Sequence, residues 1–257
     1  MRFLVALYGA IAYAIFLFTF CYAAGFVGNL LVPKSIDVGS PPGAAGDPLA
    51  LSAAIDVLLL GLFAVQHSVM ARPAFKRWWT RIVPPGAERS TFVLLASLAL
   101  VFMVLEWRPL PATVWDVSGS PAGMLLRGVF VLGWALVLVS TFQIDHFELF
   151  GLKQVWRLLT GRPAPAAEFR TPLFYRHVRH PIYLGFVLGF WATPVMSAGH
   201  LLFATVTSAY ILVGIAFEER DLVAQFGQRY RSYREQVGML LPRLPRLVRR
   251  DARRGGA

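Results

Sequence analysis

The chain contains 257 residues, of which 56% are hydrophobic and 15% are charged, and its mean hydropathy is +0.57. This composition is too apolar for an ordinary soluble domain. Several apolar runs reach the roughly 20 residues that an α-helix needs to cross a bilayer. We therefore expect one polytopic domain over residues 1–257, all-α and integral to a membrane. The net charge of +11 gathers in particular loops, which favours contact with membrane lipids over nucleic acid.

Four transmembrane helices are predicted within residues 1–143, at 3–32, 49–70, 90–105 and 124–143. The only cysteine, Cys21, lies in the first of them, and we expect it to be a buried apolar thiol. The rest of the chain divides by composition. We expect a cytoplasmic connector over 144–180, a cofactor-binding hairpin with a surface helix over 181–242, and a basic tail over 243–257.

The stretch between His180 and Glu218 contains no charged residue. A proline and a Ser-Ala-Gly-His run near its middle indicate a turn, so we expect a helical hairpin with legs at 182–197 and 201–217. Pro181 suits the first turn of a helix, where its missing N–H costs nothing. Because the hairpin folds back on itself, its two polar ends are predicted to meet on one side of the membrane.

Basic residues are distributed unevenly between the loops. The loop 72–89, the connector 144–179 and the part from residue 218 onward hold 21 of the 25 Lys and Arg. The positive-inside rule therefore places these three regions in the cytoplasm, together with both termini and the polar ends of the hairpin.

Four apolar or aromatic residues follow the hairpin at helical spacing. Phe226, Tyr230, Tyr233 and Val237 recur at i, i+4, i+7 and i+11, with polar and basic residues between them. This pattern predicts one amphipathic helix at the cytoplasmic membrane surface.

Several short motifs follow one another over the last third of the chain. They are Arg179-His180-Pro181-x-Tyr183-x-Gly185, then the apolar hairpin, Glu218-Glu219-x-x-Leu222, Phe226-Gly227-x-x-Tyr230-x-x-Tyr233, and Leu241-Pro242. In this order they resemble the isoprenylcysteine carboxyl methyltransferase family. The resemblance implies an integral membrane enzyme that binds S-adenosyl-L-methionine at the cytoplasmic end of the hairpin. It implies the cofactor-binding residues Arg179, His180, Pro181, Tyr183, Gly185, Glu218 and Glu219.

The rest of the chain is similar to the bacterial methanethiol S-methyltransferases, most clearly at 25–35, 66–73 and 142–151. This resemblance implies that methanethiol is methylated to dimethyl sulfide in the bacterial inner (cytoplasmic) membrane. One departure from the prenylcysteine enzymes is visible. Residues 238–241 are apolar where those proteins usually carry a basic residue before the final proline, which argues against a charged or prenylated substrate.

Methyl transfer from a sulfonium to a thiolate neutralises charge, so positioning and exclusion of water can supply most of the acceleration. The thiol must lose its proton, which requires a base or an electropositive setting. We predict His67, His146 and Glu218 as catalytic residues. His67 is an ionisable group near the end of a transmembrane segment, and such groups are often functional. Each residue has a structural alternative. His67 could be a hydrogen-bonded histidine within the helix bundle, His146 a polar surface group, and Glu218 a partner in a salt bridge to arginine.

No metal site is expected, because the five His and one Cys show no ligand spacing. Two other functions remain as alternatives. One is a methyltransferase for a larger lipidic acceptor, such as a prenylcysteine carboxylate or a phospholipid. The other is a non-enzymatic membrane carrier or sensor of small ligands. The sequence does not define the oligomeric state or the group that accepts the thiol proton.

Overall fold

The computed structural model describes residues 2–44, 46–165 and 168–243, which are mainly helical. Within these residues, five helices are long and apolar enough to cross a membrane, so the chain is an integral membrane protein. They are α1 (Arg2–Gly28), α2 (Leu49–Ala71), α4 (Pro85–Glu106), α5 (Pro121–Ile144) and α9 (Ala198–Phe226). A further apolar helix, α8 (Pro181–Trp191), has 11 residues and packs against α5 and α9.

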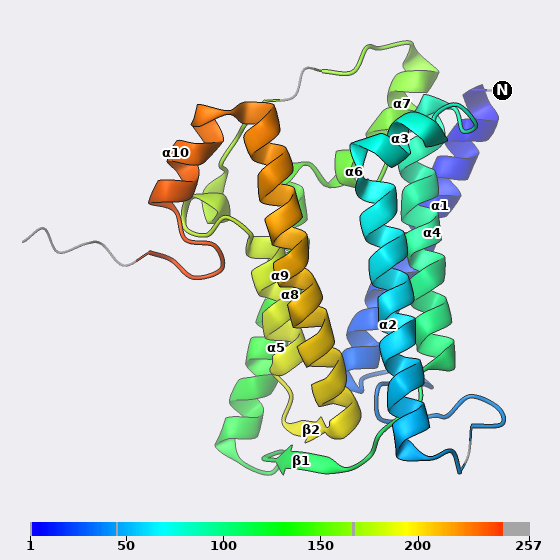
Figure 1. The fold of residues 1–257 in the computed structure, drawn as a ribbon, viewed down its shortest axis with the longest axis vertical. Coiled ribbons are helices and arrows are strands. Elements are labelled where there is room, and N and C mark those ends of the chain that lie inside the picture. Colours follow the sequence, from blue (N-terminus) through cyan, green and yellow to red (C-terminus); the bar gives the residue numbers. More distant parts are fainter. Residues whose placement is uncertain (1, 45, 166–167, 244–257) are drawn as a thin grey trace, which may run out of the picture.

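Shorter elements gather at the two ends of the helix bundle (Figure 1). The start of α1 shares one end with α3 (Pro73–Trp79), α6 (His146–Leu149), α7 (Leu152–Thr160) and α10 (Gln228–Gln236). We call this the polar end, and the 3-10 turn η1 (Leu173–Arg176) leads from it into α8. The other end carries β1 (Thr113–Asp116) and β2 (Val195–Ser197), which pair antiparallel with Thr113 opposite Ser197.

A helix occupies each of the four spans predicted before the hairpin. The largest difference is in α4, which begins at Pro85 instead of residue 90. Proline is favourable in the first helical turn, because the N–H that it lacks would have no intrahelical partner there. The polar character of this first turn hid it from a hydropathy pattern.

The predicted legs of the hairpin, 182–197 and 201–217, are wrong. Helix α8 ends at Trp191, while α9 starts at Ala198 and continues through the two glutamates to Phe226. Glutamate and arginine are good helix formers, so a change from apolar to charged residues ends the apolar surface without ending the helix. With 29 residues, α9 is long enough to cross a bilayer, whereas α8 is not.

The predicted amphipathic helix is divided in two at Gly227. Helix α9 ends at Phe226, and Gly227 adopts a φ of 58°, which glycine tolerates without steric cost. The aromatic face of α10 then packs on the protein itself. Tyr230 is buried and, with Tyr233, contacts the ring of Phe169 in an edge-on arrangement. This packing joins α10 to the connector before η1.

Two other expectations concern the outer parts of the chain. Cys21 is exposed on α1, so the prediction of a buried thiol is wrong. The predicted basic tail, 243–257, lies outside the described residues except for Arg243.

The close packing of α5 against α8 depends on glycine. A Cβ atom on Gly185 would lie 2.6 Å from the Gly133 carbonyl oxygen, and one on Gly133 would lie 2.7 Å from the Gly189 nitrogen. Small residues allow helix backbones to approach in this way within a membrane. The contact fixes the start of α8 relative to α5 and therefore positions the polar end.

The strand-bearing end of the bundle is closed by a large apolar cluster. Trp107 is fully buried and meets Phe26 and Phe203 edge-on. Its indole Nε1 donates to the Ile36 carbonyl oxygen at 3.0 Å. These contacts join α1, α4 and α9 at this end, and the ionisable cluster described next lies at the opposite, polar end.

Candidate functional site

A buried ion cluster at the polar end joins α8, α9 and α10. Arg179 Nε donates to Glu219 Oε1 at 2.7 Å, and His180 Nε2 lies 3.1 Å from the same oxygen. The side chains of Arg179 and Glu219 are only 8% and 11% exposed. Arg234 of α10 lies 3.6 Å from Glu219 Oε2. The carboxylate of Glu219 is therefore the centre of the cluster, and the predicted residues Arg179, His180 and Glu219 do meet.

The start of α8 presents this cluster as predicted. Pro181 occupies the first turn, and His180 is the N-cap residue with a φ of −128°. The residue before a proline is disfavoured in the helical conformation, so His180 lies just outside the regular turns of α8. Pro181 is fully buried, so it positions His180.

The segment after α10 completes the cluster, and sequence reasoning did not identify this role. The backbone N–H of Arg179 donates to the Gly238 carbonyl at 2.8 Å, and that of His180 donates to the Met239 carbonyl at 3.2 Å. A Cβ atom on Gly238 would lie 1.8 Å from the Leu241 carbonyl oxygen, so glycine is required at this turn. A glycine shortly before Leu-Pro was the available signal. Arg234 was also missed, because the helical pattern placed it on a solvated face.

Glu218 is the accessible carboxylate beside the buried cluster. Its side chain is 44% exposed, and its Oε2 lies 3.8 Å from His180 Nδ1. The Tyr183 hydroxyl lies near this carboxylate, and the Tyr183 ring centroid is 5.6 Å from that of His180. Two adjacent glutamates thus have different environments: Glu219 is held by arginine, and Glu218 can bind a cationic ligand.

Tyrosines from α10 and η1 enclose the cluster. Burial raises the pKa of the Tyr230 phenol, and the nearby Glu219 carboxylate raises it further. Burial also raises the pKa of Tyr233 to about 12. Both phenols therefore keep their protons at neutral pH and can act as hydrogen-bond donors. The Tyr233 hydroxyl donates to the Tyr175 carbonyl, which fastens α10 to η1.

Gly185, which was predicted to bind the cofactor, faces α5. Its Cα lies against the Gly133 carbonyl and Val137, the contact described above. The structure therefore accounts for this glycine through helix packing and does not place it in the ion cluster.

His67 lies on α2 among aromatic rings. Its ring centroid is 5.4 Å from that of Phe63 and 4.9 Å from that of Phe92. His67 Nδ1 is buried and has no hydrogen-bond partner among the described residues. The next residue, Ser68, shares a hydrogen bond of 3.1 Å with the Tyr210 hydroxyl of α9. This contact holds the polar-end turn of α2 against the helix that carries Glu218.

His146 is buried between α1, α5 and α6, and both of its ring nitrogens are engaged. Nδ1 lies 2.8 Å from Thr141 Oγ1, and Nε2 lies 2.8 Å from the Tyr13 hydroxyl. The Thr141 hydroxyl donates to the Leu138 carbonyl, so it accepts from His146 Nδ1–H. Nε2 is then the acceptor for Tyr13. Burial lowers the pKa of His146, against the opposing effect of the Asp145 carboxylate, which keeps the ring neutral.

The three predicted catalytic residues do not form one hydrogen-bonded group. Neither His67 nor His146 lies within 4.0 Å of a Glu218 carboxylate oxygen among the described ion pairs. The two histidines instead border one small apolar cluster, since His67 contacts Phe92 and His146 lies 4.8 Å from the Phe150 ring.

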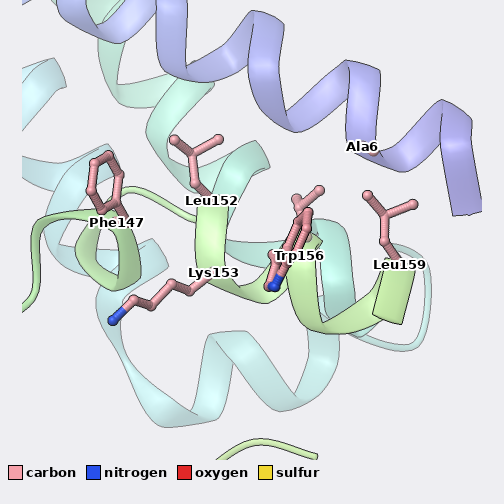
Figure 2. Close-up of a pocket in the computed structure, with 7 residues that line it drawn as sticks. Ala6, Phe147, Leu152, Lys153, Trp156 and Leu159 are labelled. Carbon is pink, nitrogen blue, oxygen red and sulfur yellow. The ribbon is translucent and has the colours of Figure 1, made fainter. Parts of the chain in front are cut away.

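No group of three metal-ligating side chains occurs in the part of the chain that the structure describes. A separate groove of about 350 Å³ lies between α1 and α7 (Figure 2). Leu152 and Leu159 point toward α1, where Ala6 lies, and the lining is apolar apart from Lys153. None of the predicted site residues lines it, so the groove is distinct from the ion cluster.

Comparison with known proteins gives full-length relatives. The chain is 54% identical over 241 residues to the methanethiol S-methyltransferase of Mycobacterium tuberculosis. The aligned region covers 94% of this chain and 97% of that protein. It is 53% identical to methanethiol S-methyltransferase 2 of Bradyrhizobium diazoefficiens, over 98% of this chain and 95% of that protein. The methanethiol S-methyltransferase of Crocosphaera subtropica is 49% identical, over 94% and 92% respectively. No family model matches the chain. No solved structure matches it either.

Proposed function

The chain belongs to the methanethiol S-methyltransferase family, and on this premise we propose that it transfers the methyl group of S-adenosyl-L-methionine to methanethiol. The product of this reaction is dimethyl sulfide. Relatives at 46–54% identity over most of the chain support the thiol acceptor over a prenylcysteine or a phospholipid. They also favour an enzyme over a ligand carrier.

The single observation that supports the donor site is the contrast between Glu218 and Glu219. Glu219 is buried against Arg179 and His180, whereas the adjacent Glu218 carboxylate is 44% exposed. S-adenosyl-L-methionine carries an ammonium group and a sulfonium, and an accessible carboxylate in a tyrosine-lined corner fits such a cation. When bound, it supplies an electrophilic methyl group.

In this proposal Glu218 binds the ammonium group of the donor, and the Tyr183 hydroxyl supports that carboxylate. The ion cluster of Glu219 with Arg179, His180 and Arg234 holds three helices in place, so the site is preorganised. His180 contributes from the N-cap of α8, where it lies between the two carboxylates.

We propose His67 as the group that accepts the thiol proton, because its buried Nδ1 has no partner among the described residues. His146 has no free ring nitrogen, since Tyr13 and Thr141 occupy both. Its proposed role is therefore to hold α1 against α5 beside the acceptor. Aromatic rings pack against both histidines, Phe92 on His67 and Phe142 on His146, and this packing limits the access of water.

We further propose that the protein lies in the bacterial inner membrane with its polar end in the cytoplasm. The loop 72–89, the connector and α10 all lie at this end and are rich in arginine, as the positive-inside rule requires of a cytoplasmic face. Reporter fusions in that loop and after α10 should both report a cytoplasmic location. A fusion in the β1 region should report the opposite side.

The test of the function is an assay of purified protein with S-adenosyl-L-methionine and a set of acceptors. Dimethyl sulfide should form from methanethiol, and hydrogen sulfide should be methylated. Prenylcysteine and phosphatidylethanolamine should remain unmethylated. Efficient methylation of prenylcysteine without turnover of methanethiol would replace this function by that of a lipidic-acceptor enzyme.

A further inference from the structure

Three buried polar atoms on α2 and α3 have no hydrogen-bond partner among the described residues: Gln66 Oε1, His67 Nδ1 and Trp79 Nε1. They adjoin one apolar cluster. Gln66 Nε2 donates to the Met70 sulfur at 3.0 Å, and His67 packs on Phe92. Buried polar groups normally have partners, so several unpaired ones around one cluster indicate a place for a polar ligand or ordered water.

Arg89 of α4 brings a cation to the same cluster. Its Cζ lies 5.0 Å from the centroid of the Phe92 ring, and His67 lies 4.9 Å from that centroid. Arg89 Nε donates to the Leu149 carbonyl at 2.6 Å, which fixes the guanidinium between α4 and α6. One NH group is therefore used for positioning, and the terminal nitrogens, which have no hydrogen-bond partner among the described residues, remain for a ligand.

The charged groups that face Arg89 leave this corner electropositive. Its carboxylate neighbours are Glu88 on α4 and Glu148 on α6. Glu148 is already paired with Arg157 at 2.6 Å. Lys76 of α3 is also close to Arg89, and burial, followed by the neighbouring Arg89 charge, lowers the pKa of its amine.

Arg72, at the end of α2, is a further cation at this corner. It is paired with Asp221 of α9 at 3.0 Å. With Glu148 already paired, Glu88 is the carboxylate near two basic side chains, Arg89 and Lys76, so positive charge is in excess at this corner.

We propose that Arg89 is a catalytic residue that binds the acceptor as its thiolate, with His67 beside it as the proton acceptor. This inference rests on the proposed function and names the form in which the substrate binds. The S–H bond of the thiol breaks, and its proton moves to His67. The thiolate sulfur then forms a bond with the methyl carbon as the carbon–sulfonium bond breaks, which releases dimethyl sulfide and a neutral thioether.

The position of this corner agrees with that role. Ser68 of α2 shares a hydrogen bond with the Tyr210 hydroxyl, Tyr210 lies near Tyr183, and Tyr183 in turn lies near Glu218. The proposed thiolate site and the proposed donor site are thus joined through the contact of α2 with α9. A guanidinium in a water-poor environment lowers the pKa of a bound thiol and stabilises the nucleophile.

The first experiment compares the parent with Arg89→Gln and Arg89→Lys, with Arg81→Gln on the same loop as an exposed control. In Arg89→Gln, kcat/KM for methanethiol at pH 7 should fall about tenfold or more and should recover as pH rises, because the thiolate then forms without help. The Arg89→Gln substitution should lower kcat/KM less for acidic thiols than for methanethiol. Arg89→Lys should retain more activity than Arg89→Gln, and Arg81→Gln should match the parent.

A second readout needs no methyl donor. The ultraviolet absorbance of thiolate is measured as methanethiol is titrated into each protein over a range of pH. The parent should show bound thiolate at a pH about one unit or more below that of Arg89→Gln. Affinity for S-adenosyl-L-methionine should be the same in both proteins. Weaker donor binding in Arg89→Gln would mean that Arg89 binds the donor carboxylate, which overturns the inference.

If Arg89→Gln does not fold, competition on the parent protein decides. Thiocyanate, a small polarisable anion, should inhibit competitively with methanethiol and should leave donor affinity unchanged. Lack of such competition overturns the inference, and so does an unchanged pH profile in folded Arg89→Gln. In either case, methanethiol turnover by the parent protein still upholds the proposed function. A parent that does not methylate methanethiol at any pH instead contradicts the proposed function.

Discussion

The Nε2 atom of His180 lies 3.1 Å from Glu219 Oε1, so the N-cap of α8 is bound to a carboxylate two turns before the end of α9. The same oxygen accepts from Arg179 at 2.7 Å. This contact joins residues that are 39 positions apart in the chain. It brings the two polar ends of the hairpin together and leaves the adjacent Glu218 free.

The first prediction separates the two glutamates. In Glu219→Gln, the Arg179 guanidinium stays buried without its counter-charge, which should cost about 3 kcal/mol of stability. Glu218→Gln removes an accessible carboxylate and should leave the melting temperature nearly unchanged while weakening the binding of S-adenosyl-L-methionine. Thermal unfolding in detergent and direct binding measure the two effects. Parent-like donor binding by folded Glu218→Gln would remove this residue from the donor site.

The second prediction concerns the glycine contact of α5 with α8. Gly185→Ala places a methyl group 2.6 Å from the Gly133 carbonyl, and forcing the helices apart should destabilise the protein by about 1–3 kcal/mol. Gly214→Ala on α9 is the matched control, because no atom lies within 4 Å of its Cβ position. That control should be neutral or slightly stabilising. A Gly185→Ala protein with parent stability but weaker donor binding would instead support a ligand contact.

The helices could be predicted because apolar runs carry a strong signal, and the start of α8 because proline restricts where a helix begins. The true end of α9 could not be predicted. Helix propensity remains high through Glu218 and Glu219 although hydropathy changes there. The pairing of Thr113 with Ser197 was also invisible, because two very short strands distant in the chain have no local pattern.

The meeting of His180 with the glutamate pair could be predicted, since the uncharged hairpin between them must return to the same side. Which glutamate is buried could not be predicted. That depends on Arg179 and on Arg234, which the break at Gly227 turns toward Glu219. The surroundings of His146 were equally inaccessible from sequence, because its partner Tyr13 is 133 positions away.

The third prediction concerns acid stability. Burial lowers the pKa of His146, so the folded protein holds the ring neutral. Above about pH 6.5 the ring is also neutral in the unfolded state and makes no pH-dependent contribution. As pH falls below that value, the unfolded state takes up the proton first, and the free energy of unfolding decreases until the folded ring is protonated as well.

The melting temperature of the parent should therefore fall as the pH drops below about 6.5. His146→Gln should be less stable at neutral pH and should show a shallower fall. His177→Gln, at an exposed position, should keep the parent profile. Equal acid sensitivity of His146→Gln and the parent would mean that other groups cause the loss.

The last prediction tests proton transfer from the thiol. If His67 accepts this proton, His67→Ala should lose kcat/KM for methanethiol at neutral pH and should regain part of it at high pH, where the thiolate forms in solution. His146→Ala should lose activity by a similar factor at every pH, because Tyr13 and Thr141 hold its ring in a structural role. The pH–rate profile of each variant, with S-adenosyl-L-methionine saturating, distinguishes the two roles. If neither substitution changes the rate or the profile, positioning of a thiolate taken from solution is the whole mechanism, and the buried Nδ1 of His67 has no part in it.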